Sequence, residues 1–389
     1  MADPDSRKSS GALPRISLVG PAYPHRGGIA HYTVCLARAL SDAGCRVQVI
    51  SFRRLYPRLL FPGRTEFDSS GDPIRFPAER ILAPLNPVRW IAAMRAIGRF
   101  SPDLVVFAWW HAWFFPCTAF CLAWLRWVRR RRVVLLCHNI GSHDRRLADR
   151  VAWRFLSRLP DVHLVHASDD APRILALHPR ARVICVPHPT YDAFAASAVT
   201  RDEARRILNL DPGDEVCLFF GLVRPYKGLD LALEAINRLR ERPRLRLVVA
   251  GEFYEPREPY DHQIARLNLA DRAIIHDRYI PNEEVAVYFR AADLLVAPYR
   301  AISHSGVVQI ARGFGLPVVA SDVGGMREIV SDGRTGLLVP PEDSQALAAA
   351  MARFFDQALA GPFRRNLEME KGRFSWSKLA ETLSNLARE

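Results

Sequence analysis

The hydrophobic residues of this chain fall into short continuous runs, separated by longer stretches in which apolar residues recur every three or four positions. Continuous apolar runs are typical of strands buried on both faces, and the wider spacing is typical of amphipathic helices. In the first half the runs predict strands at Ile16–Gly20, Val47–Phe52, Leu104–Trp109, Val133–Cys137, Val162–His166 and Val183–Val186. In the second half they predict strands at Val216–Gly221, Leu245–Gly251, Ala273–His276, Leu294–Ala297, Val318–Ser321 and Gly336–Val339.

Helical patterns separate most of these strands, for example at Ile29–Ala43 and Leu229–Arg240. Strands that alternate with helices predict an α/β protein with parallel sheets covered on both faces. The chain of 389 residues is too long for one ordinary core. We therefore predict two Rossmann-like domains, residues 1–198 and 199–375, with the seam near Tyr191 to Thr200. Residues 376–389 form a predicted helix that crosses back to the first domain.

The most apolar stretch, Leu104 to Val128, approaches the length needed to span a bilayer and is followed by four arginines, Arg129–Arg132. His111, Pro116 and Arg126 interrupt it. We favour a buried strand followed by a buried helix over a membrane span. Its aromatic motif WWHAWFF is predicted to be core, and contact with a lipid-linked acceptor is the alternative.

The formal net charge of +13 is high for a chain with ordinary apolar content. It suits nucleic acid, an anionic membrane surface or phosphorylated small molecules. The arginines are spread along the chain without a recognisable RNA-binding motif, so we expect no nucleic-acid partner. Seven cysteines without a C-x-x-C pair predict free thiols in a reducing compartment. The polar start lacks an apolar signal core, which favours a cytoplasmic protein.

Histidine, glycine and aromatic residues follow five predicted strands of the first half, in PAYPHRGG, WWHAW, CHN, HAS and PHP. Ligands of parallel sheets bind beyond the carboxyl ends of the strands. The repetition predicts a functional cluster at that edge. For His166, Asp169, Asp170 and His188 taken singly, a structural role is the more common one.

The segment Phe219 to Asp230 places Arg224 and Lys227 between Gly221 and Gly228, directly before a predicted helix. A guanidinium grips two oxygens, an ammonium supplies a point charge, and the start of a helix offers free N–H groups. Together these groups predict a diphosphate site. Two solvated cations on a loop are the alternative.

A second anion site is predicted where a helix begins near Ser305. There the amides of Ser305, Gly306 and Val307 and the hydroxyls of Ser303 and Ser305 are available. Gly27 and Gly28 precede a helix of the first domain and are predicted to face this site. The chain has neither a P-loop nor a G-x-G-x-x-G after its first strand, which disfavours an ATPase and a dehydrogenase. We expect no metal site, because the one D-x-D motif, Asp3–Asp5, lies in the polar start.

The motifs FGLVRPYKGLD, LVVAGEFY, IPNEEVAVYFRAADLLVAPY and GLPVVASDVGGMREIVSDGRTGLLV occur in one order between Phe219 and Pro341. In this order they resemble the retaining glycosyltransferases of family 4, which have the two-domain GT-B fold. In the first domain, GGIA and LLCHNI resemble the family less specifically.

The resemblance implies a metal-independent transfer of a sugar, with retained anomeric configuration, from a nucleotide-diphosphate donor to a glycan or lipid-linked acceptor. It implies no cofactor. Arg224 and Lys227 match the pair that neutralises the diphosphate. His138 matches a histidine near the donor sugar, and Gly28 matches the loop at the phosphates or acceptor. Gly251 and the region of Tyr279 and Ile280 match the surroundings of the nucleobase.

The chain departs from the family at two glutamates eight residues apart. The corresponding positions fall near Ile302 and Ile310, and neither is acidic. Gln309, Ser303, Ser305 and Gly306 are the expected substitutes for sugar and ribose contacts. Glu328 resembles a further family acid, although a helix-start role is equally consistent with its position.

Three alternatives stay open. A nucleotide-sugar epimerase and a phosphorylase would share the same two-domain plan, and the missing glutamates leave room for a subunit that binds a nucleotide sugar without turnover. The arginines at Arg129–Arg132 and the net charge also predict peripheral contact with an anionic membrane on the cytoplasmic side.

Overall fold

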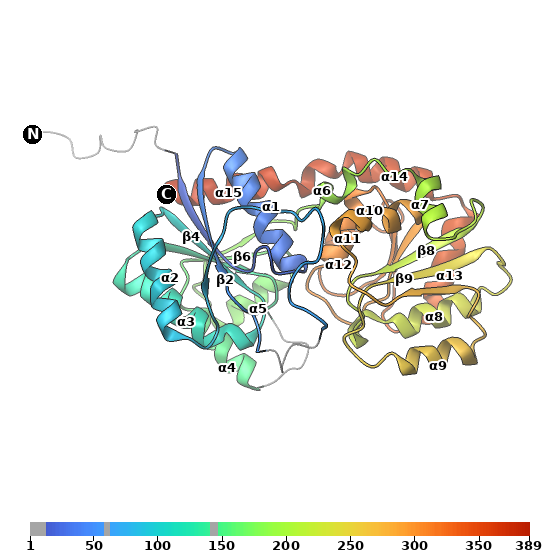
Figure 1. Ribbon diagram of the computed structural model, residues 1–389, viewed down its shortest axis with the longest axis horizontal. Helices are drawn as coiled ribbons and strands as arrows, with labels where there is room; N and C mark the ends of the chain where they lie inside the picture. The colour runs from blue at the N-terminus through green and yellow to red at the C-terminus, as the bar shows by residue number, and fades with distance from the viewer. Residues whose placement is uncertain (1–12, 58–62, 141–146) are drawn as a thin grey trace, which may run out of the picture.

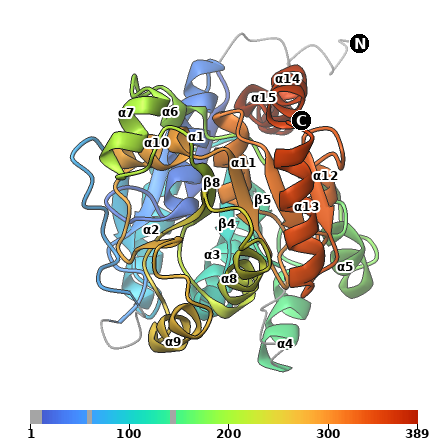
Figure 2. The ribbon, with the colours of Figure 1, turned by 90° about the vertical axis from the view of Figure 1, so that its right-hand side faces the viewer.

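The computed structural model describes residues 13–57, 63–140 and 147–389, and within α4 it does not describe the side chains of residues 147–150 and 152. The described residues form two α/β domains side by side (Figures 1 and 2). The first contains a seven-stranded parallel sheet in the order β3-β2-β1-β4-β5-β6-β7. Its strands are β1 Arg15–Val19, β2 Arg46–Phe52, β3 Glu79–Leu82, β4 Leu104–Trp109, β5 Arg132–Cys137, β6 Val162–Val165 and β7 Val183–Cys185.

Helices connect these strands and cover both faces of the sheet. They are α1 Gly28–Asp42, α2 Pro87–Phe100, α3 Phe115–Ala123, α4 Leu147–Leu156, α5 Asp170–Leu177 and α6 Asp192–Ala195, with a 3-10 turn at Ala112–Phe114 and a π-helical turn at Trp124–Val128. Local sequence sets their starts. In α2, Asn86 accepts a hydrogen bond from the Arg89 amide and Pro87 occupies the first helical position.

The second domain contains a six-stranded parallel sheet in the order β10-β9-β8-β11-β12-β13. Its strands are β8 Glu215–Phe220, β9 Leu245–Ala250, β10 Ala273–His276, β11 Leu294–Ala297, β12 Val318–Ser321 and β13 Gly336–Val339. Its helices are α7 Arg201–Ile207, α8 Leu229–Arg238, α9 Glu258–Arg266, α10 Asn282–Ala291, α11 Gly306–Gly313, α12 Met326–Ile329, α13 Ser344–Asp356 and α14 Ala360–Met369, with 3-10 turns at Pro225–Lys227 and Lys371–Phe374.

The C-terminal helix α15, Trp376–Arg388, leaves the second domain and packs against α1 of the first (Figure 1). Leu379 and Leu383 join the same buried cluster as Leu36 and Leu40 of α1. Arg132 donates a hydrogen bond to the Leu386 carbonyl at 2.9 Å. Successive residues of each strand point to opposite faces of the sheet and belong to the buried hydrophobic clusters there, as expected for doubly wound domains. The residue boundaries 198/199 and 375/376 remain predictions.

The predicted strands match the observed ones to within one residue at either end, except that β3 was not predicted. Only Leu82 of that edge strand is buried, and Glu79 and Arg80 are exposed, so no apolar run marks it. The apolar stretch Leu104 to Val128 forms β4, α3 and the two turns beside it. Across the described residues, no helix combines the length and the apolar character that crossing a bilayer requires.

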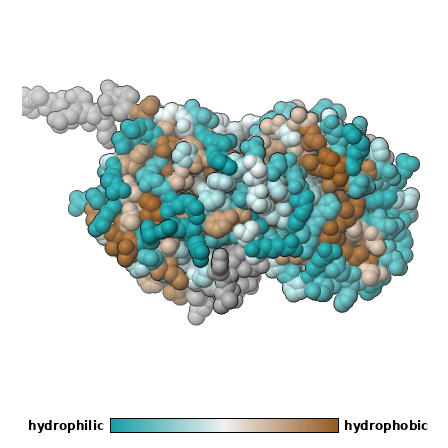
Figure 3. All heavy atoms as spheres, in the orientation of Figure 1, coloured by the Kyte–Doolittle hydropathy of each residue, from teal (hydrophilic) through white to brown (hydrophobic). Residues whose placement is uncertain are grey.

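The aromatic motif after β4 divides between core and surface. Trp109 and Phe114 are buried, whereas Trp110 is partly exposed. All seven cysteines are free thiols, as predicted; Cys185 is exposed and the other six are buried. On the face shown in Figure 3, small hydrophobic patches lie among hydrophilic side chains on both domains.

Candidate active site

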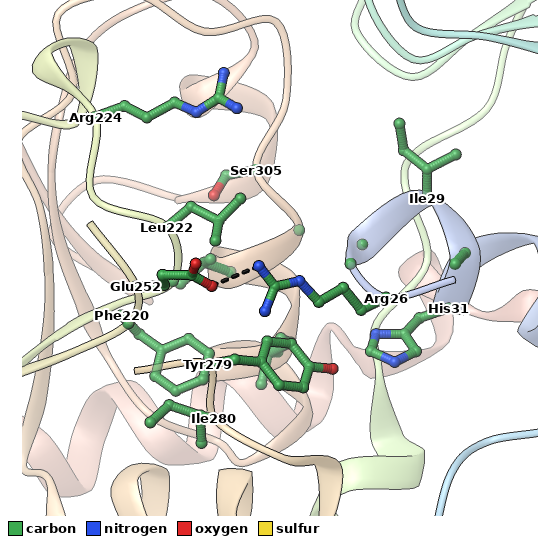
Figure 4. Close-up of a pocket in the computed structure, with 18 of the residues that line it drawn as sticks. Arg26, Ile29, His31, Phe220, Leu222, Arg224, Glu252, Tyr279, Ile280 and Ser305 are labelled. Atoms are coloured by element: carbon green, nitrogen blue, oxygen red, sulfur yellow. Dashed lines mark hydrogen bonds and ion pairs between the residues drawn. The ribbon is translucent and has the colours of Figure 1, made fainter. Parts of the chain in front are cut away.

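A cavity of about 440 Å³ lies between the carboxyl ends of the two sheets. Both domains line it, as Figure 4 shows for the side chains labelled there. Of the residues predicted from the sequence, the cavity is lined by Gly27, Gly28, Gly251, Ile280, Ser305, Gly306, Val307, Arg224 and Lys227. The location agrees with the rule that open parallel sheets bind ligands beyond their strand ends.

Arg224 and Lys227 reach this cavity because β8 ends in a tightly constrained loop. The chain leaves Phe220, makes the 3-10 turn Pro225–Lys227, and enters α8 through Gly228. Gly228 has a φ of +70°, and a Cβ there would lie 2.2 Å from the Pro298 carbonyl oxygen. Only glycine fits this backbone, so the turn fixes where the two cations stand.

Lys227 is a buried cation. Its side chain is 6% exposed, and its Nζ lies 3.4 Å from the Phe220 carbonyl oxygen and 5.9 Å from the Tyr299 ring centre. Burial, and then the positive charge of Arg224, lower the pKa of Lys227 to about 7. In the part of the chain that the structure describes, no carboxylate forms an ion pair with it. A bound anion would therefore strongly stabilise its charged form.

Arg224 is exposed toward the cavity, with its guanidinium carbon 4.9 Å from the centre of the Tyr254 ring. This cation–π contact helps to orient the guanidinium. In Figure 4, Arg224 lies on the second-domain side of the cavity, as do Ser305 and Glu252. Gly251 allows the end of β9 to lie close to the end of β8, because a Cβ there would be 2.1 Å from the Gly221 carbonyl oxygen.

Two helices begin at the cavity. Ser305 caps α11 by accepting a hydrogen bond from the Val308 amide at 3.2 Å, which leaves the Gly306 and Val307 amides at the helix start. Gly27 caps α1, whose first residues Gly28 and Ile29 line the opposite wall. Neither helix has an acidic residue in its first turn. Both ends therefore favour an anion.

Four expected site residues do not line the cavity. Ser303 uses its carbonyl oxygen to accept from the Gly325 amide at 3.1 Å. Gln309 is fully buried on the inner face of α11, and among the described residues its side-chain amide has no partner. Glu328 accepts hydrogen bonds from the amide and hydroxyl of Ser168, both at 2.7 Å, and so ties the second domain to the first.

His138, the fourth, lies behind the cavity in a cluster with His166, His188 and His304. Ring centres are 5.0 Å apart for His166 and His188, 5.1 Å for His188 and His304, and 6.0 Å for His138 and His304. Only His304 lines the cavity. Burial lowers the pKa of all four imidazoles, and that of His166 to about 4. The cluster is therefore uncharged at neutral pH.

Sequence reasoning missed the contact that crosses the cavity. Arg26, directly before Gly27, pairs with Glu252 of the second domain at 2.5 Å and donates to the Tyr254 hydroxyl at 3.1 Å. Figure 4 shows this ion pair as a dashed line. The guanidinium of Arg26 also lies 4.8 Å from the centre of the Tyr279 ring. The position of Arg26 before a glycine pair was a usable signal, but nothing in the sequence indicated its partner.

A first-domain loop closes the same side of the cavity. Asp68 accepts from the Tyr279 hydroxyl at 3.2 Å, and the Ser70 hydroxyl accepts from the Asn282 amide at 2.9 Å. Burial raises the pKa of Asp68, but hydrogen bonds from His31 and Ser70 outweigh it and hold that pKa at about 2. The loop therefore holds the two domains together beside Ile280, where the nucleobase was expected.

Among the described residues, no group of His, Cys, Asp and Glu side chains is arranged to hold a metal ion. The D-x-D motif Asp3–Asp5 lies outside the described residues.

Comparison with protein families gives matches on both domains. Residues 26–209 match the family model described as Glycosyltransferase Family 4, and residues 214–357 match the model described as Glycosyl transferases group 1. The two matches are consecutive and together include both walls of the cavity.

Curated relatives share part of the chain. A D-inositol 3-phosphate glycosyltransferase of Mycobacteroides abscessus is 32% identical over 230 residues, which is 57% of this chain and 50% of the relative. One of Segniliparus rotundus is 36% identical over 192 residues, covering 46% of this chain and 41% of the relative. The chain thus spans about half the length of the curated relatives it matches.

Solved structures share the whole fold at low identity. Sucrose-phosphate synthase of Thermosynechococcus elongatus superposes with a TM-score of 0.76 at 22% identity, covering 96% of this chain and 98% of that one. HepE of Anabaena, solved in complex with UDP-glucose, gives a TM-score of 0.74 at 20% identity over 95% and 99% of the two chains. The family matches and this architecture agree, and the chain belongs to the group 1, family 4 glycosyltransferases with the GT-B fold.

Proposed function

We propose that this protein transfers a sugar from a nucleotide-diphosphate donor to a hydroxyl group of an acceptor, with retained anomeric configuration and without a metal ion. One observation carries the proposal: Arg224 and the buried Lys227 stand together at the cavity between the two sheets. A buried ammonium without a counter-charge is unfavourable. A doubly charged leaving group would compensate for that cost.

The donor's diphosphate would lie between these cations and the starts of two helices. Arg224 and Lys227 approach it from the second domain, together with the Gly306 and Val307 amides. Gly28, the first residue of α1, would offer its amide to it from the first domain. HepE of Anabaena, which shares this fold, is solved with UDP and with UDP-glucose, which supports a nucleoside diphosphate as ligand class. The base would lie beside Gly251 and Ile280.

In the transfer step, the acceptor hydroxyl oxygen forms a bond to the anomeric carbon as the bond from that carbon to the diphosphate oxygen breaks. The bonding electron pair leaves with the diphosphate, and the hydroxyl proton passes to a diphosphate oxygen. Arg224 and Lys227 stabilise the charge that develops on the leaving group. His304, which lines the cavity in front of His138, takes the place beside the donor sugar that the resemblance assigns to His138.

The acceptor is proposed to be a glycan or lipid-linked sugar. The name of the curated relatives, D-inositol 3-phosphate glycosyltransferase, makes a phosphorylated polyol the second candidate.

Peripheral contact with an anionic membrane, on the cytoplasmic side, is part of the proposal. An arginine-aromatic surface lies where the helix after β4 ends, and consists of Arg126, Trp127, Val128, Arg129, Arg130, Phe155 and Arg158. Trp127 is 67% exposed and Phe155 is 62% exposed. Arg126 donates to the Leu159 carbonyl at 3.1 Å, which joins the two segments. Exposed aromatic rings among arginines suit the interface of a bilayer that contains anionic lipid.

An epimerase, a phosphorylase and a non-catalytic binding subunit are the competing functions. The cavity lacks the two family glutamates, and Gln309 does not reach it. Product analysis separates the functions. Purified protein is incubated with a panel of nucleotide sugars in EDTA, and the reaction is followed for released nucleoside diphosphate. We expect release from one donor class and its loss in Lys227→Ala. An epimer still attached to its nucleotide, or binding without any release, would contradict the proposal.

A further inference from the structure

The first-domain wall of the cavity is aromatic. Leu55 and Tyr56, which follow β2, and Trp110, which follows β4, line it opposite the cations of the second domain. Strands alternate the direction of their side chains, so Trp109 enters the core and packs on Trp153 while its neighbour Trp110 reaches the cavity. Trp110 is partly exposed and lines the cavity, so its ring can contact a ligand there.

This wall is held in place by the residues behind it. The ring centre of Trp110 lies 4.2 Å from that of Phe114, which is only 1% exposed, and 5.9 Å from that of Phe52. The indole nitrogen of Trp113 donates to the Leu55 carbonyl at 3.3 Å. A platform fixed in this way loses little side-chain entropy when a ligand packs on it.

The wall also continues into the site proposed for the donor. Burial raises the pKa of Tyr56, while a hydrogen bond with Trp110 and the nearby charge of Arg224 oppose that rise. A ligand on Trp110 and Tyr56 would therefore lie next to a diphosphate held by Arg224.

The charges around the wall do not suit a phosphorylated ligand. Of the described lysines and arginines that line the cavity, Arg224 and Lys227 are assigned to the donor, and Arg26 is paired with Glu252. The wall instead carries the carboxylate of Glu66, which accepts from the Leu55 amide at 3.0 Å. A carboxylate accepts hydrogen bonds from hydroxyl groups and repels a phosphate.

We propose that Trp110, with Tyr56 and Glu66, forms the acceptor subsite and that it takes an uncharged sugar ring rather than a phosphorylated polyol. The C–H face of a pyranose packs on the Trp110 ring, whose face carries partial negative charge. Glu66 accepts a hydrogen bond from a ring hydroxyl. This inference rests on the proposed function and specifies the acceptor for the same cavity.

Saturation-transfer NMR on the full chain tests the subsite with methyl glycosides of glucose, galactose, mannose and N-acetylglucosamine, and with D-inositol 3-phosphate. We expect saturation transfer to at least one methyl glycoside. The signal of that glycoside should fall about fivefold or more in Trp110→Ala and should be largely retained in Trp110→Phe. Trp127→Ala removes an exposed tryptophan outside the cavity and serves as the matched control. Its signal should equal that of the unmodified protein.

Saturation transfer to D-inositol 3-phosphate but not to the glycosides would overturn the inference. So would glycoside signals that are equal in Trp110→Ala and Trp127→Ala. Calorimetry with UDP, GDP and ADP on the same preparations separates this failure from failure of the proposed function. The nucleoside diphosphate that binds should bind Trp110→Ala within about twofold of the unmodified protein, which also shows that the variant folds. Glycoside binding without binding of any nucleoside diphosphate would remove the transferase proposal and leave the sugar subsite.

Discussion

Arg26 of the first domain and Glu252 of the second form an ion pair across the cavity, with 2.5 Å between the guanidinium nitrogen and the carboxylate oxygen. Their side chains are only 5% and 2% exposed. Glu252 also accepts from the Arg64 amide at 2.6 Å, so one carboxylate holds two segments of the first domain. The pair therefore contributes to the relative position of the domains as well as to the wall of the site.

Arg26→Ala should destabilise the protein by about 3 kcal/mol, because it leaves Glu252 buried without its opposite charge. The free energy of unfolding in urea measures this. Arg257→Ala breaks an exposed pair with Asp261 and is the control, for which we expect no more than about 0.5 kcal/mol. Equal effects of the two substitutions would show that the cavity pair is not structurally important.

Nucleoside diphosphate binding above pH 7 should take up close to one proton. Burial and Arg224 lower the pKa of Lys227 to about 7, so much of the side chain is neutral at pH 8, and a bound diphosphate would restore its charge. Calorimetry in buffers of different ionisation enthalpy counts the protons. Affinity should fall by up to about tenfold per pH unit above 7. Lys227→Arg keeps a permanent charge, and in this variant proton uptake should vanish if binding is retained. Identical heats in all buffers would disprove the assignment.

Acid should weaken the fold through the histidine cluster. Burial lowers the pKa of His166 from an ordinary value of 6.5 to about 4, so its contribution to stability is present above pH 6.5 and is lost as the pH falls toward 4. Between pH 7 and 4 the loss is about 3 kcal/mol. His166→Asn should therefore lose that much less free energy of unfolding over this range than the unmodified protein. His262→Gln changes an exposed histidine of α9 and should follow the unmodified profile. Parallel profiles for all three proteins would contradict the prediction.

Vesicles should bind the arginine-aromatic surface. In flotation at low salt, we expect the protein to rise with vesicles that contain anionic phospholipid and to remain behind with purely zwitterionic ones, since each basic residue near the surface adds about 1 kcal/mol. A Trp127→Ser and Phe155→Ser double variant should bind several-fold less. Met369→Ser, which removes a side chain 72% exposed on α14, is the control. Absence of flotation with either lipid would remove the membrane contact.

The strand positions were predictable because most of the strands lie in largely apolar runs bounded by polar residues. The edge strand β3 was not, since three of its four residues are exposed or half-buried and carry no such signal. Arg224 and Lys227 could be predicted as site residues because they lie between two glycines in one short, continuous motif. Contacts between loops far apart in sequence have no local signature, so the ion pair of Arg26 with Glu252 was missed.

Position in the sequence alone did not predict which side chains face the cavity. Gln309 was expected in the site because it lies next to Ile310, the position of a family glutamate. The helical period of α11 instead directs its side chain inward, beside the buried Val308 and Arg312. In WWHAWFF, Trp109 and Trp110 are neighbours at a strand end, where side chains alternate in direction. Trp109 is therefore buried, whereas Trp110 lines the cavity. Composition alone did not indicate which tryptophan faces the cavity.

Calorimetric titration with nucleoside diphosphates in EDTA tests the central claim most directly. UDP, GDP and ADP, and for comparison the corresponding monophosphates, are titrated separately into the unmodified protein, Arg224→Ala, Lys227→Ala and the surface control Arg257→Ala. We predict that one diphosphate binds without metal, that it binds more tightly than its monophosphate, and that each cavity variant weakens it by about a hundredfold, the cost of one charge-assisted contact. Equal affinity in all four proteins, or equal affinity for diphosphate and monophosphate, would contradict the account.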